Sequence, residues 1–237
     1  MLVLALDTAT PAVTAGVVEL TDTGIVQRSV HVTHDARKHA ELLMPGVLTA
    51  CADAGVALRD LHAVVTGTGP GPFTGLRVGM VTAAALGDAL GIGVHGVCTH
   101  DAIAADARGE ALLVVTDARR REVYWAAYDA DGRRVDGPHV TAPADVVGHA
   151  AVRAAGGSAA VSGLPVVGPE SPSPAGLVTV AADALRAGVV PGPLEPLYLR
   201  RPDAVEPGAR KRVTGSSAPA GTTAPAPTAS PVGERSA

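Results

Sequence analysis

The most informative part of the sequence is the glycine-rich stretch Thr66-Gly-Thr-Gly-Pro-Gly-Pro-Phe-Thr-Gly-Leu-Arg-Val-Gly79. A short apolar run, Ala63–Val65, precedes it, and a helical pattern of small residues, Leu76–Leu90, follows. The order is therefore strand, glycine loop and helix. The glycines allow a tight turn with exposed backbone N–H groups, and the helix points its positive end at the loop. Because the spacing matches neither the dinucleotide fingerprint nor the P-loop, the loop is either an anion cradle or a turn that docks the helix on a sheet.

The composition restricts the classes of function. The chain has 237 residues, of which 47% are apolar and 2% aromatic, and its formal net charge is −4. This length suits one large domain or two small ones, with a core built from Ala, Val and Leu. The shortage of aromatic residues disfavours a stacking platform for single-stranded nucleic acid, and the negative charge disfavours a broad basic face. The charge does not exclude RNA as a substrate held by a partner.

Cysteine usage and the N-terminus bear on location. Cys51 and Cys98 have no CxxC spacing, which favours two buried thiols in a reducing compartment over a disulfide or a zinc knuckle. The apolar run Leu2–Asp7 is short and lacks a basic flank, so it predicts a strand and not a signal peptide. No apolar run approaches the length of a membrane span. We expect a cytoplasmic protein that does not bind membranes.

Outward from the glycine loop, the pattern predicts a first α/β lobe. The strand Leu2–Asp7 is followed by two strands joined through a turn, which suggests an antiparallel start to a mixed sheet. The other expected elements are strands at Val13–Leu20 and Ile25–Val32, a helix at Lys38–Ala54 that contains Pro45, a strand at Gly93–Val97 and a helix at Thr99–Arg108.

The pattern then restarts. A buried strand, Ala111–Asp117, ends in an acidic residue as the first strand does, and hairpin strands follow at Glu122–Asp129 and Arg133–Val140. The repetition predicts an N-terminal lobe (residues 1–109), a smaller C-terminal lobe (residues 110–207) and a disordered tail rich in Ala, Pro, Ser and Thr (residues 208–237). The further elements expected in the second lobe are a helix at Pro143–Ala154, a strand at Ala160–Gly168 and a helix at Ala175–Ala187.

Three stretches together resemble the TsaB family. They are Leu4-Ala-Leu-Asp-Thr-Ala-Thr10, Gly69-Pro-Gly-Pro-Phe-Thr-Gly-Leu-Arg-Val-Gly79 and Thr116-Asp-Ala-Arg-Arg-Arg-Glu-Val-Tyr-Trp-Ala126. His39–Pro45 and Pro196–Ala204 strengthen the match. The resemblance implies an α/β protein with the actin-like ATPase (ribonuclease-H-like) fold, in which two lobes contain mixed sheets flanked by helices. It also implies a part in making threonylcarbamoyladenosine in tRNA, beside the anticodon.

The resemblance further implies a non-catalytic scaffold that activates a partner. That partner is the catalytic threonylcarbamoyltransferase subunit, TsaD, and a small ATPase subunit, TsaE, acts with it. We expect tRNA to meet this chain only indirectly. In the family the docking surface is formed by the two long helices, which also offer a route to a homodimer. The interface residues expected here are His39, Leu43, Val47, Arg77, Gly79, Met80, Ala83 and Gly87. The competing interpretation is that the small-residue face packs on the chain's own sheet, since both arrangements give an apolar stripe.

Four residues are candidates for nucleotide contact. Asp7, Thr8 and Thr10 follow the first strand, where actin-like folds hold nucleotide phosphates, and Asp117 is the counterpart in the second lobe. The competing interpretation is a turn capped by its own side chains. We expect that this chain requires no cofactor, with ATP or ADP and magnesium held weakly or at an interface as the alternative.

The sequence departs from the catalytic relative at that relative's metal site. The relative carries two metal-binding histidines four residues apart, shortly after the helix that follows the glycine loop. Here the matching positions are His100 and Ala104, and one imidazole cannot replace a pair. We therefore expect neither catalytic residues nor a metal in this chain.

Two other classes of function remain open from the sequence. One is a glycoprotease-like, metal-dependent peptidase, although no Ser or Cys lies in a recognisable nucleophile motif. The other is an actin-like small ATPase or kinase, in which Asp7 and Asp117 would hold a hydrated magnesium ion. A zinc site built from His31, His34 and His39 is a further alternative.

Overall fold

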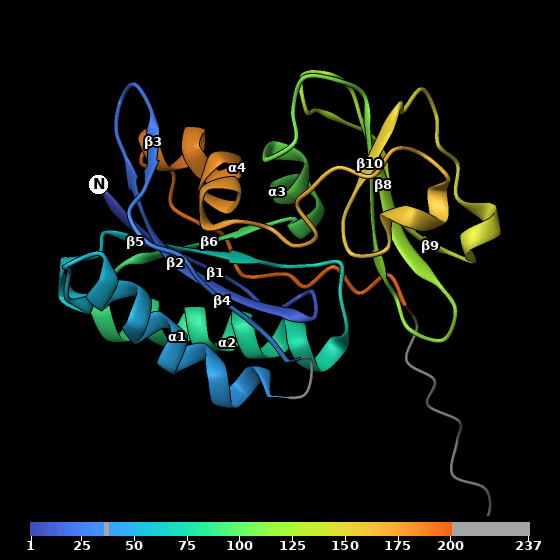
Figure 1. Ribbon diagram of the computed structural model, residues 1–237. Coiled ribbons are helices and arrows are strands. Elements are labelled where there is room, and N and C mark those ends of the chain that lie inside the picture. The colour runs from blue at the N-terminus through green and yellow to red at the C-terminus, as the bar shows by residue number, and fades with distance from the viewer. Residues whose placement is uncertain (36–37, 201–237) are drawn as a thin grey trace, which may run out of the picture. The chain divides into compact units, whose positions relative to one another are not determined.

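The structure is a computed structural model and describes residues 1–35 and 38–200 (Figure 1). The predicted tail, residues 208–237, lies outside the described residues. Two separate sheets organise the described chain, as the repeated sequence pattern predicts. Among the described residues, no helix combines the length and the apolar character that crossing a membrane requires.

The first sheet is mixed, and its antiparallel start is confirmed. Its strand order is β3-β2-β1-β5-β6, with β4 also paired to β2. β1 pairs antiparallel with β2 and parallel with β5, which in turn pairs parallel with β6. The strands are β1 (Leu2–Asp7), β2 (Ala12–Leu20), β3 (Ile25–Gln27), β4 (His31–His34), β5 (Ala63–Gly67) and β6 (Gly93–Val97).

One expected strand, Ile25–Val32, is divided into β3 and β4. The division lies at Ser29, whose hydroxyl accepts a hydrogen bond from Val17 N and donates one to Ala50 O. The backbone N–H groups of Arg28 and Ser29 both bond to Val17 O, which interrupts the regular pairing with β2. The buried Ser29 therefore joins β2 to the helix that contains Ala50, and the strand is interrupted at this position.

Helices cover both faces of the first sheet (Figure 1). α1 (His39–Asp53) and α2 (Phe73–Leu90) lie on one face, and α4 (Pro174–Arg186) lies on the other, beside α3 (Thr99–Ala105). Because both faces are covered, the central strands are apolar on both sides. Leu4 and Leu6 of β1 pack toward α1 and α2, whereas Val3 and Ala5 pack toward α4.

The glycine loop docks α2 on the sheet at close range. A Cβ atom added at Gly79 would lie 2.5 Å from Thr8 Oγ1, and one added at Gly75 would lie 2.5 Å from Thr8 O. A Cβ atom at Gly87 would collide with the side chain of Val94 on β6. The glycines of α2 therefore let its backbone lie against β1 and β6, which a larger side chain would prevent.

The second sheet has the order β10-β7-β8-β9. Its strands are β7 (Leu112–Asp117), β8 (Val123–Tyr128), β9 (Arg134–Thr141) and β10 (Arg153–Ala155), so the predicted strand and hairpin are confirmed. Three short 3₁₀ segments complete the described elements: η1 (Leu58–Asp60), η2 (Pro143–Asp145) and η3 (Ala159–Ser162).

Three expectations for the C-terminal half are wrong. The segment Pro143–Ala154 contains only the short η2 and the start of β10, and Ala160–Gly168 contains η3 and no strand. The assignment of residues 110–207 to one lobe also fails for α4. The apolar face of that helix, which includes Leu177 and Leu185, packs with β1, β2 and β5 of the first sheet. The helix packs there because the first sheet has a free apolar face to bury, although the second sheet is nearer in sequence.

Candidate functional site

The turn after β1 is built around a fully buried carboxylate. Asp7 Oδ2 accepts a hydrogen bond from Thr99 Oγ1 at 2.7 Å, and Oδ1 accepts one from Ala9 N at 2.8 Å. Gly67 on β5 has no side chain because a Cβ atom would overlap the Asp7 carboxylate. Burial raises the pKa of Asp7 to about 6, against the opposing effect of the hydrogen bonds from Thr99 and the turn backbone. Asp7 therefore joins the end of β1 to the start of α3.

The two threonines of this turn hold the long helices in place. Thr8 Oγ1 donates to Gly75 O at 2.6 Å and accepts from Gly79 N at 2.9 Å. Thr10 Oγ1 accepts from Ala12 N at 3.3 Å, and Thr10 O lies 3.1 Å from His39 Nε2 at the start of α1. Each of these groups already has a partner within the chain, so the arrangement supports the interpretation of a turn capped by its own side chains.

The second candidate carboxylate, Asp117, is held by a different set of partners. It ends β7 and is half exposed. Its Oδ1 accepts from Arg119 N at 2.8 Å, and its Oδ2 lies 3.5 Å from Arg119 Nε. Asp7 and Asp117 thus lie on separate sheets and are held by separate partners. Nucleotide contact at Asp7, Thr8, Thr10 and Asp117 stays a prediction.

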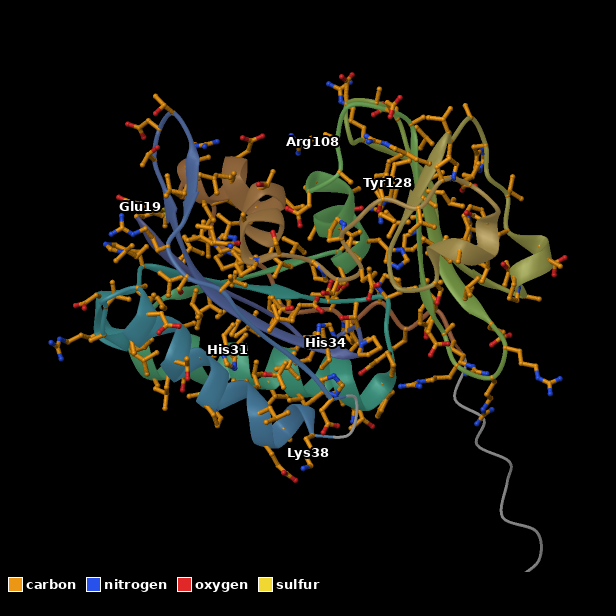
Figure 2. All side chains as sticks on the ribbon, in the orientation of Figure 1. Glu19, His31, His34, Lys38, Arg108 and Tyr128 are labelled. Carbon is orange, nitrogen blue, oxygen red and sulfur yellow. The ribbon has the colours of Figure 1, made fainter. Side chains whose placement is uncertain are left out.

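The joint between the two sheets includes two polar side chains of α3, the buried His100 and the half-buried Asp101. His100 Nε2 lies 2.8 Å from Thr116 Oγ1 on β7. Burial, aided by the nearby charge of Arg134, lowers the pKa of His100 to about 3, so this imidazole is neutral near pH 7. Tyr128, which Figure 2 shows on the second sheet at the side of α3, donates its hydroxyl to Asp101 Oδ1 at 2.8 Å.

The position that matches a catalytic metal pair does not fit a metal. His100 is fully buried and occupied by Thr116, and Ala104, one turn further along α3, is also buried. Within residues 1–35 and 38–200, no three His, Cys, Asp or Glu side chains are grouped so that they could hold a metal ion. Figure 2 shows His31 and His34 on β4, and the His31 ring lies against Gly46 of α1.

Most of the residues expected at a docking surface on the long helices are buried within the chain. Five of the eight expected interface residues are fully buried against the chain's own sheet: Leu43, Val47, Gly79, Ala83 and Gly87. Met80 is buried as well, and His39 is half-buried. A residue that already packs in the core cannot present itself to a partner, so the competing interpretation of the small-residue stripe is correct. Of the expected set, only Arg77 is exposed.

The opposite face of the same helices is exposed and apolar. Leu48 of α1 is 53% exposed and Val81 of α2 is 65% exposed. Pro45 and Ala52 of α1 and Ala84 and Ala85 of α2 are exposed beside them. We call these six residues the outer face. The signal was present in the sequence, because Leu48 and Val81 are large apolar residues that fall outside the buried helical period of their neighbours.

A C-terminal segment, Pro196–Arg200, reaches the start of α2. Leu197 N donates to Thr68 O in the glycine loop at 2.8 Å. The Tyr198 ring stacks on Phe73 with ring centroids 5.0 Å apart, and Arg77 Nε donates to Tyr198 Oη at 3.1 Å. These contacts span more than 100 residues of sequence, and no local pattern predicts them.

Comparison with known proteins agrees with the resemblance described above. A family model described as "TsaD: tRNA N6-adenosine threonylcarbamoyltransferase" matches residues 27–185. An uncharacterized protein of Mycobacterium tuberculosis is 58% identical over 204 residues, which are 85% of this chain and 93% of that protein. The tRNA threonylcarbamoyladenosine biosynthesis protein TsaB of Escherichia coli is 36% identical over 135 residues, which are 55% of this chain and 56% of that protein.

The solved structures agree with the sequence relatives. YeaZ from Pseudomonas aeruginosa is 29% identical and covers 84% of this chain and 99% of its own, with a TM-score of 0.69. The two mixed sheets flanked by helices are those of the actin-like, ribonuclease-H-like fold, as expected. The matches of sequence and of fold together show that this chain is a member of the TsaB family.

Proposed function

We propose that this chain is a non-catalytic subunit that pairs with a catalytic, TsaD-type threonylcarbamoyltransferase and supports the synthesis of N6-threonylcarbamoyladenosine in tRNA. The names of its relatives give the pathway. The observation that supports the role of a docking subunit is the outer face of α1 and α2, where large apolar side chains lie exposed on two adjacent helices. Exposed apolar surface of this kind is typical of protein–protein contact.

The polar residues of the chain support a non-catalytic role. A catalytic carboxylate must be reached by substrate, metal or water, whereas the Asp7 carboxylate is fully buried and both of its oxygens accept hydrogen bonds from the chain itself. The one histidine at the position of the relative's metal pair is buried, neutral and bonded to Thr116. Each group that would do chemistry in an actin-like enzyme thus has a structural task here.

The same observations bear on the rival classes of function. A small ATPase or kinase would need Asp7 and Asp117 to share a hydrated magnesium ion, and these two carboxylates have separate partners. A metal-dependent peptidase would need paired ligands at positions 100 and 104, where the second residue is alanine. We expect ATP or ADP, and the small ATPase subunit TsaE, to act with the assembled pair and not with this chain alone.

The docking role is tested by size-exclusion chromatography with light scattering, with the cognate catalytic subunit added. The variant carries Leu48→Glu and Val81→Glu, which place two carboxylates in the outer face. Burying unpaired charges at the centre of an interface costs about 2 kcal/mol or more, so the heterodimer should weaken by at least roughly 30-fold. A homodimer formed through the same face should weaken in parallel.

A matched control separates docking from folding. Val135→Glu with Val147→Glu makes the same chemical change at two exposed valines of the second sheet region. This control should leave the heterodimer intact, and both double variants should keep the far-ultraviolet circular dichroism of the parent. Failure of the parent chain to bind the catalytic subunit, with the small ATPase subunit and nucleotide present, would refute the docking role.

A further inference from the structure

A segment that follows α4, residues 189–198, lies beside α2 and contacts it at both ends. At one end, Val190 lines a groove of about 490 Å³ together with Ala84 of α2. At the other end, the Tyr198 ring stacks on Phe73 of α2 with ring centroids 5.0 Å apart. We call residues 189–198 the edge segment.

The edge segment packs along β6, the last strand of the first sheet. A Cβ atom added at Gly93 would lie 3.4 Å from the Pro191 ring, and one added at Gly96 would lie 3.0 Å from Leu194 Cδ2. The three prolines in residues 191–196 fix their own φ angles. The backbone is therefore restrained before a partner arrives, so docking on the edge segment loses little conformational entropy.

This restrained segment exposes a large side chain at each end. Val190 is 87% exposed, the largest exposed fraction of any large apolar side chain that the structure describes. Tyr198 is 41% exposed and lies on Phe73, which is 49% exposed. The other three aromatic residues of the chain are buried in β8. Exposed apolar and aromatic side chains of this kind are typical of contact with another protein.

The exposed side chains at both ends of the edge segment continue the outer face of the long helices. Phe73, Arg77 and Val81 are spaced four residues apart, so their side chains follow one face of α2. Ala84 belongs to the outer face and also lines the groove beside Val190. A partner that covers the outer face of α2 therefore also reaches both ends of the edge segment.

We propose that the catalytic subunit docks on the edge segment as well as on the outer face, with Val190 and Tyr198 as the anchors of this second contact. The groove receives a large apolar side chain of the partner, because its lining is apolar residues and glycine apart from Asp88. At the other end, the Phe73–Tyr198 pair receives an apolar surface of the partner. A carboxylate of the partner pairs there with the Arg77 guanidinium, which lies 3.9 Å from the Phe73 ring centre.

The proposal rests on the proposed function, because it takes the catalytic subunit as the partner. It adds a contact that lies outside α1 and α2, in a part of the chain made after α4. The outer face around Leu48 and Val81 can bind the catalytic subunit without this contact. The proposal can therefore fail while the docking role stands.

The test measures the dissociation constant of the full chain and the cognate catalytic subunit by isothermal titration calorimetry. Val190→Glu places an unpaired carboxylate in the contact and should weaken the heterodimer by at least roughly 10-fold. Gly192→Trp should weaken it as well, because a Cβ atom at Gly192 meets no atom within 4 Å and the new ring can fill the groove. Tyr198→Ala should weaken binding by at least roughly 10-fold, whereas Tyr198→Phe, which keeps the ring, should stay within about threefold of the parent.

The matched controls are Val147→Glu and Gly148→Trp, which make the same changes at exposed positions between η2 and β10. They should leave the affinity within about twofold of the parent, and all variants should keep the parent's far-ultraviolet circular dichroism. Parent affinity in Val190→Glu, Gly192→Trp and Tyr198→Ala would overturn the proposal and leave the docking role of the outer face standing. Loss of a homodimer in these variants with the heterodimer unchanged would also overturn it, because a second copy would then be the occupant. A parent chain that does not bind the catalytic subunit would overturn the proposed function itself.

Discussion

The contact between Gly79 and Thr8 offers a sharp test of how the glycine loop fixes α2. Gly79→Ala would put a Cβ atom 2.5 Å from Thr8 Oγ1, the atom that accepts from Gly79 N and donates to Gly75 O. Overpacking of a tight core costs about 1–3 kcal/mol, and two weakened buried hydrogen bonds add about 1 kcal/mol. The better helix propensity of alanine returns about 1 kcal/mol. The net loss of stability is therefore about 2 kcal/mol.

The decisive comparison is a double-mutant cycle with Thr8→Ala. That change removes the clashing oxygen, and the next atoms are then 3.6 Å and 3.7 Å from the new Cβ, which is ordinary van der Waals contact. In the Thr8→Ala background, Gly79→Ala should therefore be neutral or stabilise by about 1 kcal/mol. The free energy of unfolding is measured in urea with Trp125, the single tryptophan, as the probe. An equal loss of stability for Gly79→Ala in both backgrounds would contradict this prediction, because it would show that Thr8 is not the obstacle.

Two further predictions concern pH. The pKa of Asp7 is raised to about 6 from 3.8, so its ionisation opposes folding: this penalty is absent below pH 4 and complete above pH 6. The neutral, buried His100 makes stability depend on pH with the opposite sign over an overlapping range, so the test compares the unfolding free energy of Asp7→Asn with that of the parent. Between pH 4 and pH 7 the variant should gain about 3 kcal/mol of stability relative to the parent. A difference that does not change with pH would contradict this prediction. At the exposed end of the second sheet, hydrogen bonds from two histidines lower the pKa of Asp136 to about 2, so its contribution to stability is present above pH 4 and lost as the pH falls toward 2. Asp136→Asn should remove this loss of stability at acid pH. The measurement is the fluorescence emission of Trp125 during acid unfolding, because Trp125 packs against both histidine rings. An unchanged acid transition in the variant would argue against this role of Asp136.

The parts of the fold that the sequence predicts are those encoded locally. The continuously apolar β1, the glycine loop and α2 follow one another without interruption, so their order and pairing can be read directly. The restart at β7 is equally visible, because Asp117 repeats the acidic end of β1. In these regions turn chemistry, hydrophobic period and burial agree.

The elements that were misplaced depend on contacts distant in sequence. The hydrophobic period of α4 predicts an apolar face, but it does not predict which sheet that face packs against. In the structure, Leu177 packs against strands more than 150 residues earlier in the sequence. The burial of Gly79 and Ala83 could not be predicted, because small residues on one side of a helix suit a sheet and a helix bundle equally. The stack of Phe73 on Tyr198 has no sequence signature, since aromatic pairs across 125 residues leave no period.

The packing of α4 has a consequence for the order of synthesis. The N-terminal sheet is left with one uncovered apolar face until Pro174–Arg186 arrives, and by then the whole second sheet has been made. The second sheet is in effect an insertion within the first lobe, so a fragment ending near residue 109 would lack the helix that completes its core. During synthesis on the ribosome, the core of the first lobe can therefore be completed only after α4 has been made. A terminal deletion that reaches Leu177 should disrupt the N-terminal sheet before it disturbs the neighbouring one.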